Sequence, residues 1–128
     1  MRKNGIEFEE LSSRVIGCAL EVHRELGPGL FESAYETCLG HELNRANLAF
    51  MRQVTLPISY KSFTLDCGYR IDLVVEESLL VELKCVEKIL PIHEAQILTY
   101  LKLSRIKVGL LMNFNERYLK DGLKRFVM

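Results

Sequence analysis

The sequence has no excess of charge of either sign and no long apolar run. Lysine plus arginine and aspartate plus glutamate number 17 each in 128 residues, so the formal net charge is zero. The chain therefore lacks the overall positive potential that is typical of many nucleic-acid-binding domains. No apolar stretch approaches the roughly 20 residues that a membrane-spanning helix needs. We therefore expect no membrane association, and the net charge gives no support to nucleic-acid binding.

Cysteines are few and scattered, and no CxxC pair of the kind found in zinc or iron–sulfur sites is present. We expect reduced thiols that act as small core residues at Cys18, Cys38, Cys67 and Cys85. The N-terminus is polar and acidic after its first three residues, so it does not resemble a signal peptide. These observations predict a cytoplasmic protein.

Several common catalytic motifs are also missing. The sequence contains no P-loop, no Gly-x-Gly-x-x-Gly and no Gly-x-Ser-x-Gly.

Basic residues are unevenly spread along the chain. Residues 102–128 carry seven basic and two acidic groups, whereas residues 1–50 carry five basic and eight acidic groups. This distribution is consistent with a local basic surface or with an ordinary solvated face.

What is present predicts one globular domain over residues 1–128. Hydrophobic residues make up 48% of the chain and occur throughout it. Apolar residues at three- and four-residue steps predict a helix over 7–26, ended by Gly27-Pro28-Gly29, and a second helix from Leu30 or Phe31 to about 44–47. The apolar face of the second helix would include Phe31 and Tyr35, and we expect Tyr35 to be a core residue. A third helix is predicted from Pro91 to about residue 103.

A period of two predicts strands in the middle of the chain. These are 50–56, two extended segments around a turn near Lys61, and then 68–76 and 79–86, together an antiparallel meander. The apolar stretch 105–113 follows a helix, so we expect it to pair in parallel with the strand that contains Glu82. A turn or short helix at 116–122 and a last strand at 123–128 complete an α/β (α+β) fold, a central mixed sheet flanked by helices.

Charged residues interrupt the strands 68–76 and 79–86, at Asp72, Glu82 and Lys84. Alternation places Ile71, Leu73 and Val75 on the face opposite to Asp72. Charged side chains are rarely buried unless they are paired or bind a metal. A structural salt bridge would contribute little to stability. We therefore favour a site in which the two acids, with the Leu83 carbonyl, bind Mg²⁺ or Mn²⁺ and Lys84 acts on a metal-bound water.

The ordered set of Glu32, Asp72, Glu82, Lys84, Gln96 and Tyr100 resembles the PD-(D/E)XK nuclease superfamily, with Ile71 in place of the proline in its signature. Within that superfamily, Gly29-Leu-Phe-Glu32-Ser-Ala-Tyr35 is similar to the motif of the GxxExxY proteins. The run 81–88 and the stretch His93-Glu-Ala-Gln96-Ile-Leu-Thr-Tyr100 resemble them too. The resemblance covers nearly the whole chain and implies a restriction-endonuclease-like fold and metal-dependent hydrolysis of phosphodiesters in nucleic acid, most simply DNA.

The resemblance also implies roles for single residues. Asp72, Glu82, Lys84 and Glu32 would be catalytic, and the three acids among them would hold the metal. Glu32 has an alternative explanation, since an acid in the first turn of a helix is stabilised by the helix dipole. Gln96 and Tyr100 share one helix face and would contact the metal site or the substrate, although Tyr100 could also simply pack.

Two other functions are consistent with the same residues. The first is a non-catalytic nucleic-acid- or protein-binding module that retains the nuclease fold, which the neutral charge favours. The second is a hydrolase of RNA or of a small molecule that uses the same metal site. The sequence leaves the oligomeric state open, a homo-oligomer included.

Overall fold

A mixed β-sheet with helices on both faces forms the centre of the molecule. The computed structural model describes residues 2–3 and 6–128, and in this part helices α1 (Phe8–Leu26), α2 (Glu32–Arg45) and α3 (Pro91–Ser104) surround a five-stranded sheet. The strands lie in the order β3 (Phe50–Thr55), β6 (Arg70–Val75), β7 (Leu79–Lys84), β8 (Val108–Asn113) and β9 (Leu123–Val127). The β7–β8 pair is parallel and the other pairs are antiparallel, which confirms the predicted architecture.

Short elements complete the chain. β1 (Arg2–Lys3) and β2 (Ile6–Glu7) form a small antiparallel ribbon before α1, which the sequence did not predict. A 3-10 helix, η1 (Leu119–Gly122), leads into β9, where a turn or short helix was expected. None of the described helices is both long and apolar enough to cross a membrane.

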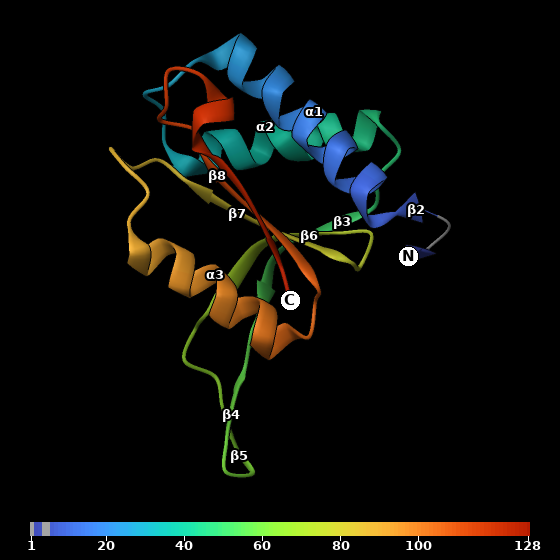
Figure 1. Cartoon of the computed structure of the whole chain (residues 1–128), viewed down its shortest axis with the longest axis vertical. Coiled ribbons are helices and arrows are strands. Elements are labelled where there is room, and N and C mark those ends of the chain that lie inside the picture. The colour runs from blue at the N-terminus through green and yellow to red at the C-terminus, as the bar shows by residue number, and fades with distance from the viewer. Residues whose placement is uncertain (1, 4–5) are drawn as a thin grey trace.

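The core has two layers, one on each face of the sheet. The larger layer lies beneath α1 and α2 and includes Leu11, Val15, Tyr35, Leu39 and the inward residues of β6, β7 and β8. The smaller layer lies beneath α3, which runs along the opposite face (Figure 1). Here Gly109 permits close approach, since a Cβ at this position would lie 3.1 Å from Ile97 Cδ1 and 3.2 Å from the Leu101 methyl carbons. The lack of a side chain at Gly109 therefore allows α3 to pack closely against β8.

The strict alternation expected for β6 is wrong at Ile71. Leu73 and Val75 pack in the layer beneath α1 and α2, as predicted, but Ile71 packs in the layer beneath α3. The break falls at Asp72, beside Gln53 of β3, whose φ of 51° lies in the left-handed region. Because a left-handed residue departs from strand geometry, the edge strand β3 is locally distorted opposite the acid, although its register with β6 is the same on both sides.

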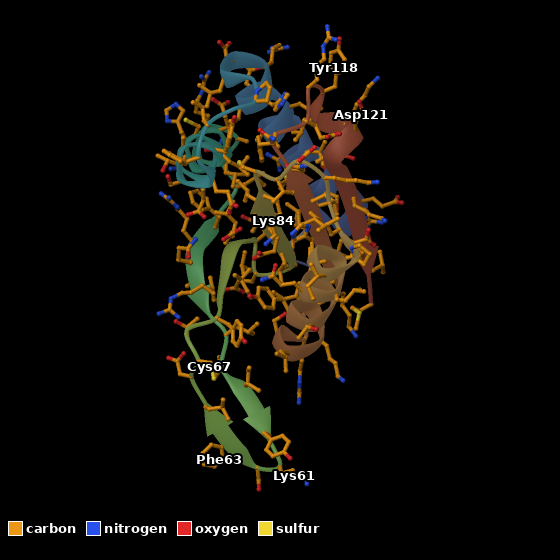
Figure 2. All side chains as sticks on the ribbon, turned by 90° about the vertical axis from the view of Figure 1, so that its left-hand side faces the viewer. Lys61, Phe63, Cys67, Lys84, Tyr118 and Asp121 are labelled. Carbon is orange, nitrogen blue, oxygen red and sulfur yellow. The ribbon has the colours of Figure 1, made fainter. Side chains whose placement is uncertain are left out.

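The predicted meander is also interrupted. β3 pairs directly with β6, and the chain between them forms a separate hairpin of β4 (Ile58–Tyr60) and β5 (Phe63–Leu65). Lys61 and Ser62 both have positive φ, as the tight two-residue turn of a hairpin requires. The hairpin projects from the body of the molecule beyond α3 (Figures 1 and 2).

One residue assigned to the buried face of the second helix is exposed. Phe31 precedes the first turn of α2 and keeps 84% of its surface accessible. The apolar face of α2 begins further along the helix, where Tyr35, Leu39 and Leu43 are fully buried. Phe31 therefore lies at the surface next to Glu32.

Candidate active site

The candidate site lies where the β6–β7 ladder ends. Backbone pairing between the two strands runs from Val75–Leu79 to Leu73–Val81. At the next position carboxylates replace the backbone acceptors. The Asp72 N–H donates to Glu82 Oε1 at 2.9 Å, and the Leu83 N–H donates to Asp72 Oδ2 at 2.9 Å. Each acid thus bonds to the backbone of the opposite strand, and the two carboxylates are held next to each other.

Both carboxylates are less acidic than in water. Glu82 is only 4% exposed, and burial, followed by the charge of Asp72, raises the pKa of Glu82 to about 8. Burial also raises the pKa of Asp72, with further contributions from the charges of Glu36 and Glu32. Desolvation and repulsion between like charges both disfavour the ionised forms. Without a bound cation, the buried pair therefore favours the protonated form of at least one carboxyl group.

Lys84 points toward α3. Its Nζ donates a hydrogen bond to Gln96 Oε1 at 2.8 Å, and Gln96 Nε2 donates to the Tyr100 hydroxyl at 3.2 Å. Among the described residues, no ion pair joins Lys84 to Asp72 or Glu82, although its charge lowers the pKa of Glu82. The simple salt bridge considered as an alternative is therefore not formed. Instead, α3 holds the ammonium group beside the acids.

Tyr100 belongs to the same chain of contacts and is largely covered. It is 6% exposed, and this burial raises the pKa of its hydroxyl group. The hydrogen bond with Gln96 lowers the pKa and offsets part of that increase. Its ring meets the ring of Tyr69 edge to face, with 6.4 Å between centroids. Gln96 and Tyr100 thus lie at the site on one face of α3, as their spacing predicted.

The other predicted acid, Glu32, lies near the carboxylates without bonding to them. It is exposed in the first turn of α2 and makes no hydrogen bond or ion pair within the described part of the chain. Its charge nevertheless contributes to the raised pKa values of Asp72 and Glu82. The structure therefore places Glu32 at the border of the site, a position compatible with both explanations given for it.

A second acid of α2, which the sequence interpretation missed, lies closer to the bonded network. Glu36 is 7% exposed and accepts hydrogen bonds from Arg52 Nε at 3.0 Å and Gln53 Nε2 at 2.8 Å. Gln53 Nε2 also lies 3.4 Å from Asp72 Oδ1. The four-residue step from Glu32 puts both acids on one helix face. This spacing was the sequence signal that could have identified Glu36. Gln53, at the distorted point of β3, connects Glu36 to Asp72.

Tyr35, the last residue of the GxxExxY-like motif, is structural. It is fully buried, and its ring stacks on Phe114 with 4.6 Å between centroids. Its hydroxyl donates to the Gly27 carbonyl and accepts from the Leu30 N–H, at 2.5 and 3.1 Å. This confirms the interpretation of Tyr35 as a core residue, and it shows that the side chain anchors the loop that precedes Glu32.

Two buried polar residues bond to the backbone of other segments, and one of them, Asn113, is paired with Lys84 across the sheet. Asn113, at the end of β8, is 1% exposed and bonds to both the N–H and the carbonyl of Val86, just beyond Lys84. His23, which is 7% exposed, places its Nε2 2.8 Å from the Glu116 carbonyl oxygen. Both contacts join segments distant in sequence, so spacing alone gave no signal for them.

The donor chemistry of the site fits a hard divalent cation. Asp72 and Glu82 each accept a backbone N–H with one oxygen, and of the other two oxygens Asp72 Oδ1 has only the long contact of 3.4 Å with Gln53 Nε2, while Glu82 Oε2 accepts no hydrogen bond from the described residues. Mg²⁺ and Mn²⁺ prefer carboxylate oxygens and water, and they often take only one or two carboxylates from the protein. Within the described residues, no three acidic, histidine or cysteine side chains form a ready-made metal cluster. The residues thus fit a two-carboxylate site completed by water or backbone oxygen.

Comparison with known proteins identifies the family of this chain. The family model of the PD-(D/E)XK nuclease superfamily matches residues 9–126, nearly the entire chain. No curated protein and no solved structure matches significantly. The matched region contains both strands that bear the acids, the helix that bonds to Lys84, and all of the central sheet except the last residue of β9. This chain therefore belongs to the PD-(D/E)XK nuclease superfamily.

Proposed function

We propose that this protein is a metal-dependent nuclease that hydrolyses phosphodiester bonds, with DNA as the expected substrate. The observation that carries the proposal is the pair of facing carboxylates with a lysine beside them. Burial and the mutual repulsion of the two acids raise their pKa values, so a cation bound between them would favour their ionised forms. A divalent cation would supply positive charge to the two acids, and the negative charge of a phosphodiester would complement Lys84.

The residues would divide the chemistry as follows. Asp72 and Glu82 would hold Mg²⁺ or Mn²⁺, with Glu32 reaching it directly or through water. The ion would polarise the phosphate and lower the pKa of a bound water. Lys84, oriented by its bond to Gln96, would position the attacking water or stabilise negative charge that develops on the phosphate. Tyr100 would support Gln96 from the far side.

The finer family assignment is also a proposal. The motif of Gly29, Glu32 and Tyr35 supports membership of the GxxExxY proteins within the superfamily. The buried Tyr35 fixes the loop that carries Gly29, so the motif would act by presenting Glu32 toward the strands. A structural role for the tyrosine is compatible with a role of the acid at the metal.

Calorimetry on wild type and Asp72→Asn tests the metal site. Asparagine keeps an acceptor for the Leu83 N–H, so the fold is retained, whereas removal of the charge should weaken Mg²⁺ or Mn²⁺ binding by at least about tenfold. The matched control is Asp121→Asn, because Asp121 lies on η1, away from Lys84 (Figure 2). Equal metal affinity in wild type and Asp72→Asn would contradict the proposed site.

Cleavage assays test the catalytic part of the proposal. Wild type should cut DNA only when Mg²⁺ or Mn²⁺ is present, and Asp72→Asn should not cut it. Metal binding without cleavage of single-stranded, duplex or branched DNA would favour the other two functions. RNA cleavage would identify an RNA-directed hydrolase, and nucleic-acid binding unaffected by Lys84→Met would identify a non-catalytic module.

A further inference from the structure

A pocket opens beside the site and is not used by the chemistry described above. Its volume is about 230 Å³, and Gln96 and Tyr100 form part of its wall. The remaining wall is largely apolar, with Tyr69 from the segment before β6, Ile92 from α3 and Ile58 from β4. The pocket therefore shares two residues with the network that holds Lys84.

The size and lining of this pocket suit one flat group. Its volume falls below the roughly 300–1,000 Å³ of sites for drug-sized ligands. Tyr69 keeps 45% of its surface exposed, and Ile92 keeps 69%. The edge-to-face contact with Tyr100 holds the Tyr69 ring in place. An exposed aromatic ring in a fixed orientation offers a stacking surface, and the amide of Gln96 adds a polar group.

The projecting hairpin continues the pocket away from the site. Ile58 pairs with Leu65, and Tyr60 pairs with Phe63 across the turn. Residues paired across a hairpin lie on one face, and so do residues two apart in a strand. Tyr60 and Phe63 therefore share the face of Ile58, which lines the pocket. They are 61% and 64% exposed, and the Lys61 Nζ lies 5.4 Å from the Tyr60 ring centroid.

We propose that this pocket binds an unpaired nucleobase of the substrate, next to the phosphate held at the acids, and that the strand continues along the aromatic face of the hairpin. The inference rests on the proposed nuclease function and specifies its substrate class as single-stranded or frayed nucleic acid. In a duplex the bases are stacked and paired, so their flat faces cannot reach Tyr69, Tyr60 or Phe63. Stacking on aromatic side chains tolerates any sequence, because every base has a flat face.

The test uses single-stranded DNA of twelve nucleotides that carries the fluorescent base 2-aminopurine at each position in turn. Binding is followed in Ca²⁺, and gels confirm that the strand stays uncut. Wild type should quench the fluorescence strongly at one or two positions, because stacking on tyrosine quenches this base. Tyr69→Ala should remove that quenching and raise the Kd about 5- to 150-fold.

Three further proteins make the result specific. Tyr69→Phe keeps the ring and should behave like wild type. Tyr118→Ala removes a tyrosine of similar exposure, 54%, at the opposite end of the molecule from the hairpin (Figure 2), and should bind normally. Phe63→Ala should weaken binding of the twelve-nucleotide strand while leaving the quenching in the pocket intact. Thermal unfolding of each variant shows whether the fold is preserved.

The outcomes separate this inference from the proposed function. Position-specific quenching lost in Tyr69→Ala would support the pocket even if wild type cuts no DNA with Mg²⁺ or Mn²⁺, in which case only the nuclease proposal fails. Metal-dependent cleavage with equal strand binding by wild type and Tyr69→Ala would overturn the pocket and leave the nuclease proposal standing. Equal affinity for blunt duplex and single strand, or no binding of the single strand, would also overturn it.

Discussion

The two halves of the β6–β7 pair differ sharply, although they are built from the same two strands. Toward the turn, Leu73 and Val75 pair with Val81 and Leu79 through backbone hydrogen bonds, and all four side chains are buried in the layer beneath α1 and α2. Toward the other end, backbone pairing stops and the carboxylates of Asp72 and Glu82 accept the N–H groups that have lost their partners.

This difference shows how a fold can contain a costly cluster of acids. Buried backbone N–H groups need acceptors, and an acceptor on a side chain serves as well as one on the backbone. The acids therefore have a structural role in addition to the proposed chemical one. Burial of the apolar half stabilises the fold, whereas burial of the carboxylates in the charged half lowers its stability. A bound cation would offset this loss.

The largest expected change in stability follows from truncation in the apolar half. Leu73→Ala should lower the free energy of unfolding by about 2–5 kcal/mol, because Leu73 is fully buried and its removal leaves a cavity. Urea unfolding measures this loss. Leu98→Ala, at an exposed position of α3, is the control and should change stability by less than about 0.5 kcal/mol. A loss below about 1 kcal/mol for Leu73→Ala would contradict the assigned role of this half.

The charged half should make stability depend on pH. Burial raises the pKa of Glu82 from its ordinary 4.5 to about 8, so between these values the folded state retains a proton that the unfolded state has lost. The free energy of unfolding should then fall as pH rises through this window, by up to about 1.4 kcal/mol per pH unit. Urea unfolding without metal at several pH values measures the slope.

Glu82→Gln should reduce this slope, because the amide does not titrate and its oxygen still accepts the Asp72 N–H. Some slope should remain, since the pKa of Asp72 is raised as well. Added Mg²⁺ should also reduce the slope in wild type, because the ion favours the ionised carboxylates. Equal slopes in wild type and Glu82→Gln would show that the burial of Glu82 has no such effect.

The smallest expected change in stability comes from the lysine of the charged half. Lys84→Met should change the free energy of unfolding by about 1 kcal/mol or less, since the methionine keeps the apolar stem and Gln96 still bonds to Tyr100. Any metal-dependent cleavage should fall by roughly 100-fold or more. Lys102→Met, on an exposed position of the same helix as Gln96, is the matched control. Undiminished cleavage by Lys84→Met would remove the lysine from the proposed mechanism.

Much of the fold could be predicted from the sequence because its signals are local. The periodicity of α1 and the proline at the start of α3 marked these helices to within one or two residues. The apolar run of β8 together with the preceding helix predicted its parallel pairing with β7. The hairpin of β4 and β5 was not recognised as separate from the sheet, since short extended segments with mixed polarity look the same in both settings.

The candidate site was predicted less completely. Asp72, Glu82 and Lys84 stood out as charges in apolar strands, and the spacing of Gln96 and Tyr100 placed them on one helix face. Glu36 did not stand out, because a glutamate within a helix is common and its partners Arg52 and Gln53 belong to another element. The position of Ile71 was wrong because alternation assumes a regular sheet, and the edge strand β3 is distorted opposite Asp72.

The sequence by itself determined the order of the elements and the place of the two acids and the lysine within them, because periodicity and polarity act over a few residues. Tertiary structure decided what those charges touch. It ended the β6–β7 ladder at the acids, turned Lys84 toward Gln96 and left Glu32 at the border of the site. The physical reason is that burial and hydrogen bonding depend on neighbours from distant segments, which no local pattern specifies.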